Sequence, residues 1–261
     1  MIDILNYILQ KYDVFLIIFI RMSGIFIISP LFSRRNIPNI TKIGFTLIIS
    51  ILLIYSVNGE NLITLNGLEI FIVLVKELIL GFLIGFICYI TLMSLYIAGQ
   101  IVDMQIGFGM VNVFDPLNNS QVPIVGNFYY IIAILTFLTI NGHHILIKQL
   151  VNSFNIVPLG QIGFSDSIFQ QFIFIFSQIF VIGFKISAPI LATIFLTNVL
   201  LAILARTMPQ MNVFIVGMPL KILIGILTIV IMIPLYSVVF QHIFDFMFSS
   251  VVDFLKAVNK G

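Results

Sequence analysis

Charged side chains inside apolar stretches are the residues of this sequence best suited to specific chemistry. Six of them lie in or beside apolar runs: Lys76, Glu77, Asp103, Lys185, Arg206 and Lys221. A buried charge without a partner is strongly unfavourable, so each side chain must pair, reach the membrane surface or line a cavity. We therefore predict that these six are buried charges used in assembly.

The partners of the cations are left open by the sequence. The range 168–242 holds three of the cations and no aspartate or glutamate. Lys76 and Glu77 cannot pair with each other on one helix face, because adjacent residues point about 100° apart. The acids in similarly apolar surroundings are Glu69, Glu77, Asp103 and Asp115, and carboxylates of other subunits are the alternative. Arg206 can instead extend to the surface from a helix end.

The motifs of known enzyme classes are absent from the sequence. It has no phosphate-binding glycine loop, no HExxH, no GxSxG and no CxxC. The single cysteine excludes a multi-cysteine metal site, and the adjacent pair His143 and His144 diverges on a helix. We predict a protein that is not an enzyme, with no cofactor, no metal and no small-molecule substrate. The net charge of +2 also argues against a nucleic-acid partner.

The composition predicts an all-α, polytopic integral membrane protein. Of 261 residues, 61% are hydrophobic and 8% charged, which exceeds the apolar content that a soluble core can bury. About six hydrophobic segments follow one another, and we treat 1–261 as one membrane-embedded domain. Charge counts on the two sides of such a topology are equal, so they leave the orientation open.

Three apolar runs are longer than one membrane crossing requires. The range 68–98 must tilt, protrude or break, and its Gly81 and Gly85 form a GxxxG that lets another helix approach. The ranges 168–205 and 214–248 both contain proline, which kinks helices. We interpret each of these two ranges as a broken helix or a tight helical hairpin.

The range 98–123 is irregular, being too apolar for a solvent loop and too rich in glycine, amide and acid for a spanning helix. Non-helical backbone at membrane depth is tolerated where it packs inside protein or lines a cavity. We expect that environment here, with a helix ending in 98–105 and the chain returning at Pro123. Soft, adaptable methionines such as Met104 and Met110 suit a closure that yields.

Several motifs along the chain resemble one protein family. AGQI at 98–101, QIG at 105–107, FDP at 114–116, NGH at 141–143 and above all ARTMPQMNVFIVGMPLKI at 205–222 are similar to the FliR family of flagellar biosynthesis proteins. The broader family includes the equivalent components of virulence type III secretion systems. The resemblance covers nearly the whole chain in order, and its last motif is highly specific.

The resemblance implies a subunit of the flagellar type III export gate, in the bacterial inner membrane at the flagellar basal body. FliP, FliQ and FlhB subunits are the implied partners, together with exported unfolded flagellar proteins and the lipid bilayer. A loop of the family acts as a plug and corresponds by position to 107–119. The implied gate and plug residues are Gly107, Phe108, Gly109, Met110, Phe114, Asp115 and Pro116.

Two other functions are compatible with parts of the pattern. A secondary transporter also has broken helices and charges at mid-membrane depth, but it predicts inverted repeats, which the sequence lacks. The equivalent gate subunit of a virulence secretion system is the second alternative, although the run QMNVFIVGMPLKI favours the flagellar one.

Overall fold

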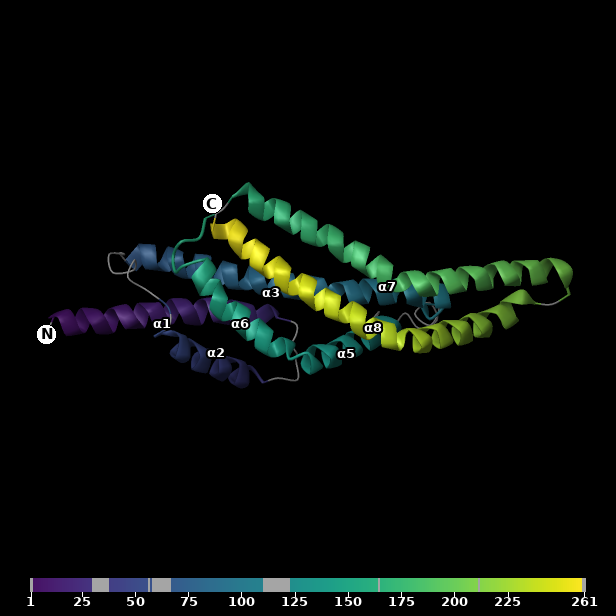
Figure 1. Cartoon of the computed structure of the whole chain (residues 1–261), viewed down its shortest axis with the longest axis horizontal. Coiled ribbons are helices and arrows are strands. Elements are labelled where there is room, and N and C mark those ends of the chain that lie inside the picture. The colour runs from purple at the N-terminus through teal and green to yellow at the C-terminus, as the bar shows by residue number, and fades with distance from the viewer. Residues whose placement is uncertain are drawn as a thin grey trace. The chain divides into compact units, whose positions relative to one another are not determined.

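All regular structure in the described part of the chain is α-helical. The computed structural model describes residues 2–29, 38–55, 57, 67–109, 123–163, 165–210 and 212–259, with side chains from residue 11 onward. The helices are shown in Figure 1: α1 Ile2–Ile28, α2 Asn39–Leu53, α3 Gly67–Ile106, α5 Ile124–Thr139, α6 Gly142–Ile156, α7 Asp166–Thr207 and α8 Val213–Asn259. The prediction of an all-α fold is confirmed.

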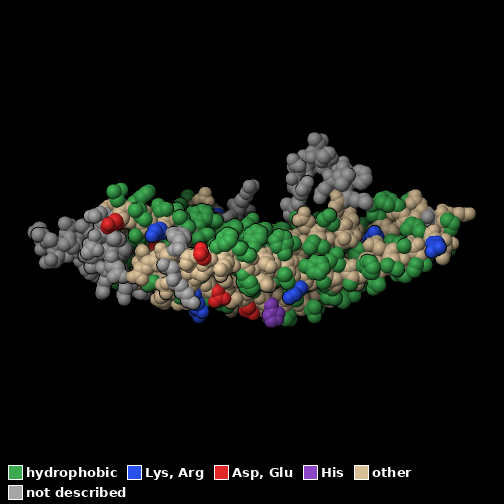
Figure 2. Space-filling model, turned by 90° about the horizontal axis from the view of Figure 1, so that it is seen from above, with side chains coloured by type: hydrophobic (Ala, Val, Ile, Leu, Met, Phe, Trp, Pro, Cys, Tyr) green, Lys and Arg blue, Asp and Glu red, His purple; other side chains and the backbone are tan. Residues whose placement is uncertain are grey.

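Three of the helices are long and apolar enough to cross a membrane. They are α3, α7 and α8, with 40, 42 and 47 residues, and the interrupted pair α5 and α6 forms a fourth candidate span. Large hydrophobic side chains remain exposed along them, and Figure 2 shows such side chains over much of one face. At about 1.5 Å per residue each long helix exceeds the ~30 Å hydrocarbon layer. The chain is therefore a polytopic membrane protein.

The interpretation of 168–205 and 214–248 as broken segments or hairpins is wrong in detail. α7 continues through Pro189, and α8 continues through Pro219 and Pro234. Proline removes one hydrogen bond, but the surrounding backbone groups find no better partners in lipid than those of the helix. The turn instead lies between the two helices, where Asn212 Oδ1 accepts from the N–H of Phe214, 3.1 Å away, at the start of α8.

The described chain forms two compact units, and the first comprises 1–91, 142–176 and 245–261. In it α1 crosses α3 at glycines. A Cβ on Gly24 would lie 2.8 Å from the carbonyl oxygen of Leu78, and one on Gly81 would overlap the carbonyl oxygen of Arg21. Gly85 faces Ile25 of α1. The predicted use of the Gly81 and Gly85 motif for close helix approach is confirmed.

The second unit comprises 92–141 and 177–244. Gly99 of α3 meets Gly126 of α5 so closely that a Cβ on Gly99 would overlap the backbone of Gly126. A buried hydroxyl pair adds specificity to this apolar core, because Tyr129 and Tyr236 lie 3.0 Å apart, oxygen to oxygen. The Tyr236 hydroxyl also donates to the carbonyl oxygen of Ile186, 3.3 Å away. Two consecutive hydrogen bonds thus connect α5, α8 and α7.

Candidate gate root and buried charge cluster

A fully buried ion pair lies in the first unit. Arg21 of α1 and Glu77 of α3 are both 0% exposed, and the guanidinium donates to the carboxylate through Nε and, over 3.0 Å, through Nη2. Bidentate contact of this kind matches the planar geometry of both groups. Glu77, predicted as a buried charge, therefore has its partner within the chain.

The same pair also binds the backbone at the end of α6. Arg21 donates to the carbonyl oxygen of Ser153, in the last turn of that helix, at 3.2 Å, and to that of Val157, the residue after the helix, at 3.0 Å. Glu77 Oε1 accepts from the N–H of Gly160 over 3.0 Å. The guanidinium lies 4.3 Å from the ring centroid of Phe154, within cation–π range. The two charges thus satisfy the carbonyl oxygen of Val157 and the N–H of Gly160, which lie beyond the end of the helix, and they add a second donor to the carbonyl oxygen of Ser153.

Asp103 lies at the root of the irregular segment in the second unit. Its carboxylate is 7% exposed, and its two oxygens lie 3.2 and 3.3 Å from the N–H of Val125 in the first turn of α5. A carboxylate at a helix N-terminus satisfies an unpaired N–H and complements the helix dipole. Asp103 therefore ties the end of α3 to the start of α5, on either side of the segment.

The segment leaves α3 where the sequence predicts. α3 ends at Ile106, Gly107 has φ +104°, and Pro123 precedes the first residue of α5. That φ favours glycine, which has no Cβ to clash. Phe108 and Gly109 follow, but Met110, Phe114, Asp115 and Pro116 lie outside the described residues.

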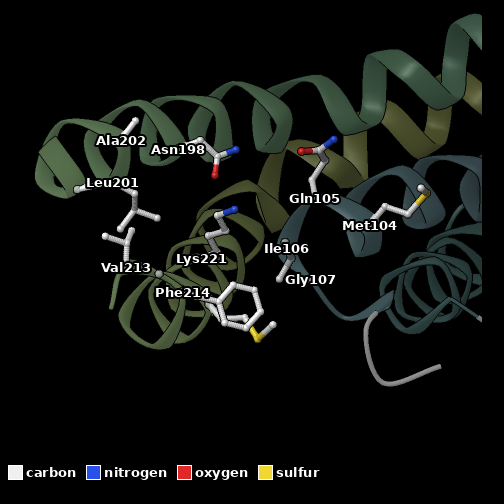
Figure 3. Close-up of a pocket in the computed structure, with 13 residues that line it drawn as sticks. Met104, Gln105, Ile106, Gly107, Asn198, Leu201, Ala202, Val213, Phe214 and Lys221 are labelled. Atoms are coloured by element: carbon white, nitrogen blue, oxygen red, sulfur yellow. The ribbon is translucent and has the colours of Figure 1, made fainter. Parts of the chain in front are cut away.

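A cavity of about 420 Å³ lies beside this root, between the end of α3 and the facing parts of α7 and α8. Its lining is Met104, Gln105, Ile106, Gly107, Asn198, Leu201, Ala202, Ala205, Val213, Phe214, Gly217, Met218 and Lys221. Figure 3 shows Gln105 extending from α3, Asn198 from α7 and Lys221 from α8 toward this space. The cavity thus combines a cation and two amides with apolar and thioether side chains.

The other predicted charges differ in exposure. Lys76 is half-buried, whereas Lys185 and Arg206 are exposed on α7. The ion pairs among the described residues include none of Lys76, Lys185, Arg206 and Lys221. Their pairing with other chains stays a prediction. The described residues also hold no group of three metal-ligating side chains.

Three residues of these sites were not predicted. Arg21 was not among the predicted buried charges, although it is the one charge in the apolar run 14–28 and Glu77 needs a cation. Gln105 and Asn198 carry uncharged amides at single positions in apolar surroundings. That polarity was their only signal, and it does not reveal that they line one cavity.

Comparisons with known proteins agree along almost the full length of the chain. The family model described as "Bacterial export proteins, family 1" matches residues 12–247. The flagellar biosynthetic protein FliR of Bacillus subtilis is 34% identical over 258 residues, covering 98% of this chain and 99% of that protein. FliR of Escherichia coli is 25% identical, covering 91% and 90%. The Yop proteins translocation protein T of Yersinia pestis is 29% identical, covering 81% and 82%.

Proposed function

Because the chain belongs to family 1 of the bacterial export proteins, we propose that it is a subunit of the flagellar type III protein export gate. It resides in the inner membrane at the flagellar basal body and helps form the closed conduit for unfolded flagellar proteins. FliP, FliQ and FlhB type subunits are its proposed partners. Its role is structural and gating rather than catalytic.

The observation that carries this proposal is the construction of the gate root, by which we mean residues 103–107 at the end of α3 together with 123–125 at the start of α5. A segment with irregular composition starts at Gly107 and ends before Pro123, and Asp103 joins the helices at its two ends. Such an arrangement anchors both ends of the segment. We propose that 107–119 plugs the conduit, with Gly107, Phe108, Gly109, Met110, Phe114, Asp115 and Pro116 in or next to the closure.

The flagellar role is favoured by the similarity to FliR proteins, since the B. subtilis protein covers 98% of this chain. The similarity to the Yop translocation protein keeps a virulence secretion system as the second candidate. Expressing the chain in a flagellated strain that lacks its own FliR distinguishes the two. Restored flagellin secretion and swimming support the flagellar role, whereas an assembled but inactive complex contradicts it.

The plug is tested by deleting Gly107 to Val111. The deletion should leave the complex assembled, because the contacts of Asp103 and of the Tyr129–Tyr236 pair lie outside it. It should make membranes leak small ions, measured as loss of membrane potential on induction. A mutant that stays tight and secretes normally would disprove the plug. Replacing 107–111 by an equally long Gly-Ser sequence separates the effect of side chains from that of length.

A further inference from the structure

We propose that the cavity at the gate root is a binding site for one carboxylate, supplied by an acidic side chain of a partner subunit. The inference rests on the proposed function, which provides the partner subunits. Its starting point is that three donors from three helices, Gln105, Asn198 and Lys221, line the same space. A primary ammonium offers three N–H donors and each amide offers two, which suits an acceptor with several lone pairs.

The charges of the second unit favour an acid from outside the chain. The ranges 92–141 and 177–244 contain three cations, Lys185, Arg206 and Lys221, and two acids, Asp103 and Asp115. Asp103 already accepts from the N–H of Val125 at the start of α5. The described residues that line the cavity include no acid. The unit thus carries more cations than acids, and Lys221, which is half-buried where Lys185 and Arg206 are exposed, has the two amides placed to share an external carboxylate with it.

The cavity surroundings make this need stronger. Lys221 lies roughly two turns inside α8 and is half-buried beside Phe214, Gly217 and Met218. An ammonium in such surroundings is stabilised far more by a paired carboxylate than by the amides alone. One cation balances one carboxylate, whereas a lipid phosphate group is more commonly held by a cluster of cations.

Occupancy of this site would act on the gate root. Gln105 lies immediately before Ile106, the last residue of α3, and Ile106 contacts Gly225 of α8 so closely that a Cβ there would lie 2.5 Å from Ile106 Cδ1. Gly107 faces Met218, another lining residue, at 4.0 Å from its would-be Cβ. A carboxylate bound by Gln105 and Lys221 therefore fixes the point from which the irregular segment departs.

The test uses a photoreactive amino acid in place of Ala202, which lines the cavity without contributing a polar side chain. Ile203, exposed on α7 and outside the lining, is the matched control position. Both photoreactive variants are expressed with the full set of export proteins, and a position is used only if its variant, with Lys221 intact, restores secretion. We expect the Ala202 position to cross-link to a partner peptide that contains aspartate or glutamate, and the Ile203 position not to reach that peptide.

Substitutions at Lys221 then identify the interaction. Lys221→Gln should lower the cross-link yield at least tenfold, Lys221→Arg should retain most of it, and Asp115→Asn should leave it unchanged. Lys221→Glu alone should abolish the cross-link to the partner peptide. Replacing the cross-linked acid of the partner by lysine in the same strain should restore it.

Three outcomes overturn the inference: a cross-link only to 110–122 of the same chain, a cross-link only to lipid, or a yield insensitive to Lys221→Gln. Because scoring requires restored secretion, a failure here is separate from a failure of the proposed function.

Discussion

Removing one partner of the Arg21–Glu77 pair should destabilise the first unit strongly. Glu77→Leu deletes the acceptor of two guanidinium bonds and of the Gly160 N–H, leaving Arg21 charged and 0% exposed. Loss of one partner from a buried pair typically costs about 3–5 kcal/mol. That corresponds to roughly two to four powers of ten in the folding equilibrium constant.

The double replacement Arg21→Leu/Glu77→Leu separates charge burial from lost packing. It removes both charges and leaves only neutral groups unpaired, namely the carbonyl oxygen of Val157 and the N–H of Gly160, because the carbonyl oxygen of Ser153 still accepts from the N–H of Val157. Each such group costs about 1–3 kcal/mol when buried without a partner. We therefore expect the double variant to be at least ~2 kcal/mol more stable than the sum of the two single changes predicts.

The assay uses Cys88, the only cysteine of the chain, which is 3% exposed and lies in the same unit. Its labelling by a maleimide during SDS titration of the detergent-solubilised complex reports unfolding of this unit. Lys256→Ala is the control, since Lys256 and Asp253 form a pair that is 63% and 58% exposed and contributes little. Additive effects of the two leucine substitutions, or an effect of Glu77→Leu no larger than the control, would refute the reasoning.

Three smaller changes test the gate root and the second unit. Gly107→Ala should cost about 1–3 kcal/mol in thermal stability of the complex because of φ +104°, whereas Gly109→Ala, with open space around it, should cost less. Asp103→Ala should raise hydrogen exchange in the first turn of α5 several-fold, since one N–H loses its acceptor. Tyr236→Phe removes two hydrogen bonds of the hydroxyl and should cost about 1–2 kcal/mol, measured as a lower thermal midpoint.

Local features of the fold could be predicted from the sequence. The end of α3 near Gln105, the return of the chain at Pro123 and the close approach at Gly81 depend on residue types that act over a few neighbours. Glycine permits both contact and unusual φ, and proline starts helices well. These properties hold in lipid as in water, so the predictions succeeded.

Helix continuity could not be predicted in the same way. The expectation of breaks in 168–205 and 214–248 assumed that each helix must match the thickness of a bilayer. α7 and α8 are longer than that and keep their helical backbone through Pro189, Pro219 and Pro234. A helix can extend beyond the hydrocarbon layer or pack against other proteins, and the sequence of one chain does not show which.

The contact partners of the buried polar residues could also not be predicted from the sequence. Apolar side chains occur on every face of α1 and α3, so periodicity does not indicate which face of one helix meets the other. Arg21 and Glu77 could be matched only by testing all opposite charges, and Gln105 and Asn198 offered no charge to match. Their common cavity depends on how three helices cross, which the spacing of residues does not encode.

The spacing of Arg21 and its partners imposes an order on synthesis of the protein. Arg21 emerges from the ribosome 56 residues before Glu77 and 136 residues before Val157. Until then the first helix carries an arginine that hydrocarbon does not stabilise. α1 should therefore stay beside the insertion machinery or the headgroup region until α3 follows, and both should enter the bilayer together. The last backbone contacts of Arg21 close only after α6 is complete, so this charge cluster forms after more than half of the chain has been made.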